Sequence, residues 1–385
     1  MDSFSSLIKG VLPPAGDRIV LRQDDDQGPD EAIDRLFPGK QRYWLDSGTS
    51  ALALALTLIR RQHPGTPAPE VIIPAYCCPD LVAAAVYAGI TPVLADLADG
   101  SCHYDQPRLR TLISSRTIAI IAINFLGLSE PIHALRSIAN QHSIALIEDN
   151  AQWFPSSSAP YRTPADFQVF SFARGKPVNL MGGGLLVSAV KHDHEVCIDA
   201  EKAASTWQYY GKCVAYNRLR QPVFYQMVSK NPLLKLGETR YQPHTAMLSM
   251  SRGPRSLLSS NVRAYWTRTR AVEHFYRKHL ARKNQLGSQI DSTPARLLRY
   301  PLLTPCREQR DELLYQLNKK GLGASQLYGA SLTSVANINV DQLKQPLATP
   351  SADAFAERLL TLPLHESVKP EHTEETLRTI RKVLG

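Results

Sequence analysis

The stretch Thr117-Ile118-Ala119-Ile120-Ile121-Ala122-Ile123-Asn124 is an unbroken apolar run that ends in a polar residue. A helical pattern follows from about Pro131 to His142, and a second apolar run over residues 144–149 ends in Glu148-Asp149. Strands that are apolar throughout are typical of a parallel sheet covered by helices on both faces. The stretch therefore predicts a strand–helix–strand unit of an α/β fold.

Shorter segments on both sides repeat this alternation. Strands are predicted at 43–45, 71–74, 92–96 and 167–170, and helices at 51–61 and 80–88. A long helix is predicted over 264–282, and strand, helix, strand and helix follow at 299–303, 308–319, 359–363 and 374–383. We predict an α/β three-layer sandwich with a mostly parallel central sheet over residues 1–262, and a smaller C-terminal α/β domain over 263–385. Residues 190–262 lose the alternation and are interpreted as an irregular aromatic and basic insert.

Composition excludes several classes of protein. Of the 385 residues, 43% are hydrophobic and 21% charged, as in an ordinary globular protein. No apolar run is long enough for a membrane span, and the N-terminus lacks the features of a secretory signal. The six cysteines show no zinc-like spacing, so no metal is predicted, and they fit a reduced cytoplasmic location. The net charge of +9 is compatible with nucleic-acid binding, but no recognition motif supports that function.

Polar residues follow the predicted strands at the points where the strands end. Because the carboxyl ends of parallel strands meet at one edge of a sheet, these residues should converge there on a ligand. They are Ser47 to Ser50, Tyr76 to Cys78, Asn124, Asp149, and the pair Ser171 and Lys176.

These residue types match the needs of pyridoxal phosphate. The cofactor's aldehyde needs a lysine, its ring nitrogen a carboxylate, and its phosphate a helix N-terminus with hydroxyl groups. Lys176, between Gly175 and Pro177, can supply the amine, and Asp149 the carboxylate. The alternatives are a surface lysine and a helix cap for Asp149. The residues suited to phosphate are Gly48, Thr49, Ser50 and Ser171, for which plain helix capping is the alternative.

Five ordered motifs then carry a family resemblance. They are 47–52 (SGTSAL), 72–74 (IIP), 89–93 (GITPV), 147–152 (IEDNAQ) and 170–176 (FSFARGK). Together they resemble the DegT/DnrJ/StrS aminotransferases, which are fold-type I pyridoxal phosphate enzymes best known for aminating nucleotide-linked keto sugars. The resemblance implies that Lys176 forms an imine with the cofactor and carries a proton, and that Asp149 holds the ring nitrogen. It further implies that Gln152 lies beside the cofactor ring, and that the enzyme is a homodimer with active sites at the interface.

Three departures from the family pattern concern the site. Cys78 stands where an aromatic residue usually stacks on the cofactor, so either its thiol or Tyr76 is expected to take that place. Asn124 stands where the family often has a histidine and is kept as a cofactor-binding candidate. Arg174 is either an anion clamp for the substrate or an exposed structural arginine.

The expected activity is transfer of an amino group, with glutamate as the donor, to the keto group of a nucleotide-linked sugar. A second hypothesis keeps the cofactor but replaces the acceptor by a keto or aldehyde intermediate of a lipid or another secondary metabolite, because residues 200–245 are rich in aromatic and basic side chains. A third is a regulator that binds the cofactor without catalysis, and the presence of Lys176, Asp149 and Ser171 argues against it.

Overall fold

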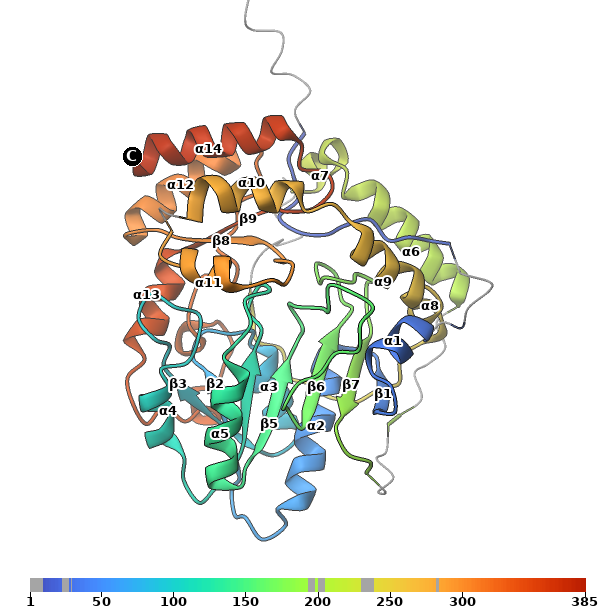
Figure 1. The fold of residues 1–385 in the computed structure, drawn as a ribbon, viewed down its shortest axis with the longest axis vertical. Helices are drawn as coiled ribbons and strands as arrows, with labels where there is room; N and C mark the ends of the chain where they lie inside the picture. The colour runs from blue at the N-terminus through green and yellow to red at the C-terminus, as the bar shows by residue number, and fades with distance from the viewer. Residues whose placement is uncertain are drawn as a thin grey trace, which may run out of the picture.

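A seven-stranded sheet forms the centre of the protein (Figure 1). The computed structural model describes residues 10–22, 28, 30–192, 198–199, 205–229, 239–281 and 284–385. The strands lie in the order β1-β7-β6-β5-β4-β2-β3, and the pairs from β3 to β6 are parallel, whereas β7 is antiparallel to both β6 and β1. Their bounds are β1 (Gln41–Leu45), β2 (Glu70–Pro74), β3 (Thr91–Ala95), β4 (Thr117–Ile123), β5 (Ala145–Asp149), β6 (Phe167–Ser171) and β7 (Gly184–Ser188).

Helices cover the sheet on both faces because alternate side chains of each buried strand point to opposite sides. Ala119 and Ile121 of β4 belong to the core packed against α2 (Gly48–Gln62) and α3 (Asp80–Tyr87). Ile120, between them, belongs to a second core with α4 (Gln106–Leu112) and α5 (Ile132–His142). A third core joins β6 and β7 to α1 (Glu31–Leu36) and α9 (Leu258–Thr267). These layers form the predicted three-layer sandwich, which is confirmed.

A second, smaller part of the protein, which we call the smaller layer, lies outside this sandwich at the top of Figure 1. It is built on a two-stranded antiparallel sheet of β8 (Tyr300–Leu303) and β9 (Leu359–Leu362). It packs with α10 (Ala271–Leu280), α12 (Arg307–Lys319) and α14 (Pro370–Leu384), and the chain passes through α11 (Gly287–Ser292) and α13 (Pro350–Arg358). Two 3-10 turns lie at Leu332–Ser334 and Val340–Gln342. The N-terminal segment joins this part, because the N–H of Leu12 donates to the carbonyl of Gly321 at 2.8 Å.

Two sequence predictions differ from the observed elements. The single helix predicted over 264–282 is instead the end of α9 followed by α10, because the backbone turns to an extended conformation at Arg268. Strand β7 was not predicted.

The predicted insert contains α6 (Thr206–Leu219), α7 (Pro222–Ser229) and α8 (Arg252–Ser256), and part of it lies outside the described residues. The domain boundary at 262/263 stays a prediction, and it falls within α9.

Candidate active site

A cavity of about 180 Å³ lies where β4, β5 and β6 end, beside the N-terminus of α2. Its position at the carboxyl edge of the sheet agrees with the general rule for ligand sites in α/β folds. The structure brings seven of the predicted residues together in its wall: Gly48, Thr49, Cys78, Asp149, Gln152, Ser171 and Lys176.

The N-terminus of α2 meets the end of β6 in this wall. Ser47 caps the helix by accepting a hydrogen bond from the N–H of Ser50 at 3.1 Å. Gly48 has no space for a side chain, since a Cβ there would lie 2.7 Å from the Cβ of Ser171. The first N–H groups of a helix lack partners within the helix and carry its positive dipole end. Gly48 and Thr49 therefore present backbone N–H groups beside the hydroxyl of Ser171, which is an arrangement suited to a phosphate.

Asp149 is a buried residue at the end of β5, and only 5% of its surface is exposed. Its Oδ1 accepts a hydrogen bond from the N–H of Ala151 at 2.9 Å. Burial raises the pKa of Asp149, and the Ala151 N–H and the charge of Lys176 oppose that rise. A buried carboxylate is costly without a cationic partner. The charge that Asp149 needs can come from a protonated ring nitrogen in the cavity.

Lys176 enters the cavity from a tight turn after β6. Gly175 adopts φ +78°, which favours glycine, and the N–H of Lys176 donates to the carbonyl of Ala173 at 3.2 Å. Burial, and then the charge of Asp80, raise the pKa of the Cys78 thiol to about 12, while the nearby charge of Lys176 opposes that rise. The thiol of Cys78 is therefore protonated at neutral pH and can act only as a small packing group beside the lysine.

Two aromatic residues of the cavity wall were missed by the sequence analysis. Tyr328 comes from the smaller layer, and its hydroxyl accepts a hydrogen bond from Nε2 of Gln152 at 2.5 Å. Phe125 follows β4 and lies in the same wall. Tyr76 packs edge-on against both rings, at centroid distances of 5.5 Å to Tyr328 and 5.8 Å to Phe125. No local motif marks Tyr328, because it lies more than 150 residues after Gln152 in the sequence.

Four predicted residues lie outside the cavity wall. Ser50 donates its hydroxyl to Oδ1 of Asp46 at 2.5 Å and so turns away from the cavity. Tyr76 contacts the rings of Phe125 and Tyr328 but does not itself line the cavity, and Arg174 is exposed. Asn124 is buried beside the end of β5, where its Nδ2 donates to Oε1 of Glu148 at 2.9 Å and to Oδ1 of Asn150 at 2.6 Å.

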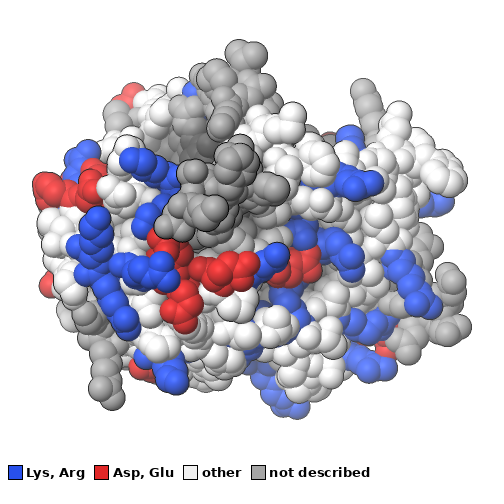
Figure 2. All heavy atoms as spheres, turned by 90° about the horizontal axis from the view of Figure 1, so that it is seen from above, with Lys and Arg blue, Asp and Glu red and all other residues white. Residues whose placement is uncertain are grey.

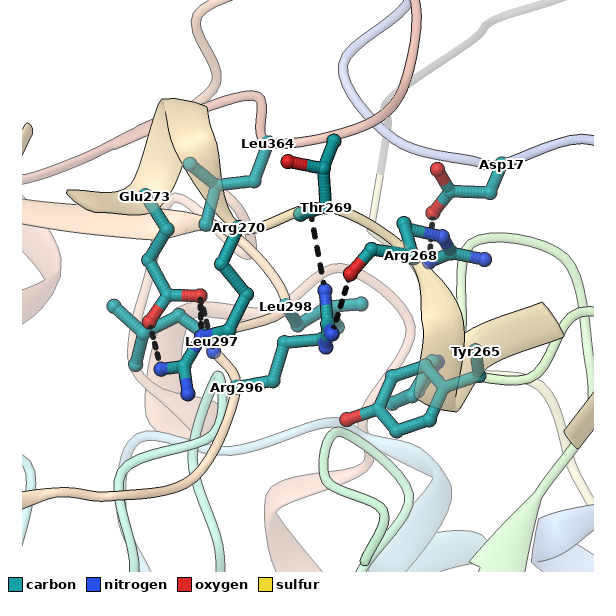
Figure 3. Close-up of a pocket in the computed structure, with 11 residues that line it drawn as sticks. Asp17, Tyr265, Arg268, Thr269, Arg270, Glu273, Arg296, Leu297, Leu298 and Leu364 are labelled. Carbon is teal, nitrogen blue, oxygen red and sulfur yellow. Dashed lines mark hydrogen bonds and ion pairs between the residues drawn. The ribbon is translucent and has the colours of Figure 1, made fainter. Parts of the chain in front are cut away.

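A second cavity, of about 30 Å³, lies next to Pro177 (Figure 3). Three arginines line it, but all have partners within the protein. Arg268 pairs with Asp17 at 2.5 Å, and Arg270 pairs with Glu273 at 2.6 Å. Arg296 donates to the carbonyls of Arg268 at 2.7 Å and Thr269 at 3.2 Å. The contacts around this cavity hold the N-terminal segment against the region between α9 and α10, and we assign no ligand to it.

The donor set of the larger cavity fits pyridoxal phosphate. A lysine and a buried carboxylate face one cavity, and a helix N-terminus with a hydroxyl neighbour occupies another part of its wall. No group of three side chains that could hold a metal occurs among the described residues. Within the same residues, no helix is long and apolar enough to cross a membrane.

Comparisons with known proteins agree with this site. The sequence profile of the DegT/DnrJ/EryC1/StrS aminotransferase family matches residues 42–219 and 260–381. A UDP-N-acetyl-3-dehydro-alpha-D-glucosamine 3-aminotransferase of Acidithiobacillus ferrooxidans is 25% identical over 348 residues, which are 88% of this chain and 83% of the relative.

Two solved structures share the fold along nearly the whole chain. PseC of Helicobacter pylori, an aminotransferase involved in the biosynthesis of pseudoaminic acid, has a TM-score of 0.69 at 18% identity and covers 98% of this chain and 99% of its own. The pyridoxal phosphate form of the sugar aminotransferase Spr1654 of Streptococcus pneumoniae has a TM-score of 0.68 at 18% identity, with 97% and 98% covered. The chain therefore belongs to the DegT/DnrJ/EryC1/StrS family of pyridoxal phosphate-dependent aminotransferases, which confirms the predicted family, enzyme activity and cofactor.

Proposed function

We propose that this aminotransferase moves an amino group from glutamate to the keto group of a nucleotide-linked sugar. The Acidithiobacillus ferrooxidans relative, which aligns over most of both chains, is named for such a substrate. The observation that carries the proposal is the single cavity wall that holds Lys176, Asp149 and the N-terminus of α2. These residues supply an amine, a carboxylate and a phosphate site at one end of the sheet.

Lys176 and Asp149 divide the proton chemistry between them. When bound, pyridoxal phosphate supplies an aldehyde for the lysine and a ring that accepts electrons once its nitrogen is protonated. Asp149 would keep a proton on that nitrogen, because a buried carboxylate gains most from a cation beside it. The amine of Lys176 would take the proton from the donor carbon that bears the amino group, as a general base, and would return it as a general acid to the cofactor carbon on the other side of that nitrogen.

The remaining wall residues hold and orient the cofactor. Backbone N–H groups of Gly48 and Thr49 and the hydroxyl of Ser171 would bind the phosphate. Gln152 would lie beside the ring, and its amide nitrogen is fixed by the hydroxyl of Tyr328. Cys78 and Phe125 line the same cavity and would exclude water from the bound ring.

The test is a half-reaction with glutamate followed by a panel of acceptors. Purified holoenzyme is mixed with glutamate, and the loss of its visible cofactor absorbance is followed. Nucleotide-linked keto sugars, UDP-linked 3-keto sugars among them, are then tested for recovery of that absorbance. We expect recovery with at least one of them. A complete half-reaction with no recovery on any nucleotide sugar would reject the acceptor class while leaving the aminotransferase activity intact.

The second candidate acceptor is a keto or aldehyde intermediate of a lipid or another secondary metabolite. The observation that favours it is the aromatic and basic character of the segment that contains α6 and α7. The first stretch that the family profile matches ends at residue 219, the last residue of α6, and the profile does not match α7. Non-sugar ketones and aldehydes in the same recovery assay distinguish the two acceptor classes.

We further propose a homodimer in a reducing, cytoplasmic compartment. The dimer rests on the family resemblance, and the compartment on the five described cysteines, all of which are free. Light scattering of the purified protein tests the dimer. Localisation of the tagged full chain by fractionation tests the compartment.

A further inference from the structure

The helices α6 and α7 carry an unusual concentration of exposed apolar side chains. Of the eleven large apolar residues that are strongly exposed in the described structure, six lie between residues 207 and 227. Trp207 is 86% exposed and Met227 is 73% exposed. The other members of this set, which we call the α6–α7 face, are Val214, Leu219, Val223 and Phe224.

Tertiary packing accounts for the opposite side of α6 but not for this face. Tyr209 of α6 donates its hydroxyl to the carbonyl of Leu180 at 2.9 Å, and Cys213 is fully buried. Asn217 bonds to both backbone groups of Ile19 at 2.9 Å. The inner side of α6 therefore holds the helix on the protein, while the apolar residues of the α6–α7 face point away from it.

The charges on this segment have one sign. Residues 205–229 include no Asp or Glu, and Lys212 and Arg218 are exposed beside the apolar residues. In Figure 2, the right-hand side of the molecule, where α6 lies, shows basic and uncharged side chains with very few acidic ones. A partner for this face must therefore offer an apolar layer together with negative charge.

We propose that the α6–α7 face docks the enzyme on a membrane surface that contains anionic lipids. Trp, Phe, Leu and Met beside Lys and Arg are the side chains that insert at the boundary between headgroups and acyl chains. In a twofold contact between two copies, Lys212 and Arg218 of one copy would instead approach Lys212 and Arg218 of the other. These like charges would repel each other. Because no described helix can cross a bilayer, the face would lie on the membrane without spanning it.

The proposal is independent of the acceptor, because docking is measured without substrate. Purified holoenzyme is sedimented with vesicles of phosphatidylcholine alone and with vesicles containing about one quarter phosphatidylglycerol. We expect partitioning about tenfold higher or more on the anionic vesicles, and a decrease when salt is raised. A blue shift of Trp207 fluorescence should accompany binding, and the Trp207→Phe variant should lose that part of the shift.

Two variants and a matched control locate the contact. Phe224→Glu combined with Met227→Glu should abolish binding to both kinds of vesicle, and Lys212→Gln with Arg218→Gln should remove the preference for anionic lipid. Tyr315→Glu changes another exposed aromatic residue, which is 59% exposed on α12, and should bind as the wild type does.

Three results would overturn the proposal. The first is wild-type protein that does not sediment with anionic vesicles, and the second is equal binding by the Phe224→Glu, Met227→Glu variant. The third is a variant whose mass in solution, without vesicles, is half that of the wild type, because the α6–α7 face would then be an interface between copies.

Discussion

The backbone N–H of Asn124 donates a hydrogen bond to the carbonyl oxygen of Asp149 at 3.0 Å. The side-chain amide of Asn124 also donates to Glu148 and Asn150, the residues on either side of Asp149. Its Oδ1 accepts a further hydrogen bond from the N–H of Glu130 at 3.0 Å. Asn124 thus fixes the end of β5 from the neighbouring strand, and it acts as a positioning residue for the Asp149 carboxylate.

Asn124→Ala should therefore lower both stability and turnover. The change leaves Glu148 Oε1 and Asn150 Oδ1 with fewer donors in a buried position, which costs about 1–3 kcal/mol in the free energy of unfolding. Turnover should fall while KM for glutamate changes little, because the Asp149 carboxyl group remains but loses its fixed position. Urea unfolding and steady-state kinetics measure the two effects. The exposed Asn140→Ala is the control, and equal losses in both variants would contradict the positioning role.

Lys176→Ala should remove the visible absorbance of the lysine-bound cofactor and the half-reaction with glutamate. The general base is lost together with the amine that binds the aldehyde, so the rate should fall by about 10²–10⁴-fold or more. Absorbance spectra and single-turnover mixing with glutamate measure this. Lys191→Ala, an exposed lysine after β7, is the control and should keep both signals. A variant at 176 that retains the absorbance and the activity would show that another lysine holds the cofactor.

Gly48→Ala should destabilise the protein and weaken cofactor binding. The added Cβ meets the Cβ of Ser171 at 2.7 Å and its Oγ at 3.0 Å, so the α2 N-terminus must move away from the end of β6. Overpacking of this kind costs about 1–3 kcal/mol. Gly65→Ala is the control, since nothing lies within 4 Å of its added Cβ. Urea unfolding of the cofactor-free protein and fluorescence titration with pyridoxal phosphate measure the two effects, and identical behaviour of both variants would contradict the proposed phosphate site.

Much of the fold follows from local sequence, whereas parts of the site depend on contacts between distant segments. Apolar runs such as 117–123 specify buried strands, and the polar residues at their ends mark the edge that holds the cavity. Ser50 was assigned to the phosphate because α2 was predicted to begin at residue 51. The helix begins at Gly48, so Ser50 lies within its first turn and bonds to Asp46.

Asn124 and Tyr328 show two other limits of the sequence. The position of Asn124 after β4 was predicted, but the direction of its side chain depends on Glu148 and Asn150 of the neighbouring strand. Tyr328 reaches the cavity only because the smaller layer packs over the sheet, and no spacing along the chain encodes that contact. The break between α9 and α10 was missed for a similar reason, because Arg268 is held there by Asp17 of the N-terminal segment.

Tyr328→Phe tests the contact between the two layers. The variant keeps the ring that packs against Tyr76 but removes the hydroxyl that holds Nε2 of Gln152. We expect a loss of about 0.5–1.5 kcal/mol in the free energy of unfolding and a fall in turnover, because Gln152 is free to rotate. Tyr315→Phe on α12 is the matched control. Unchanged turnover in the Tyr328 variant would show that the hydroxyl has no role beyond packing.

Glu130 gives the protein a pH-dependent stability that is separate from catalysis. Its side chain is buried, with one hydrogen bond from the N–H of Tyr104 at 3.2 Å, and burial raises its pKa from 4.5 to about 8. Between these two values the folded protein keeps a proton that the unfolded chain has released. The free energy of unfolding should therefore fall as pH rises through this window, by at most about 1.4 kcal/mol per pH unit, and level off above it.

Glu130→Gln should remove this dependence, because the amide has nearly the same shape and no proton to lose. Below about pH 4.5 the variant and the wild type should be similar, and the advantage of the variant should then grow up to about pH 8. Urea unfolding of both proteins at a series of pH values measures the difference, with Glu312→Gln as the control at an exposed carboxylate. A constant difference between Glu130→Gln and the wild type across this range would show that Glu130 is ionised in the folded state.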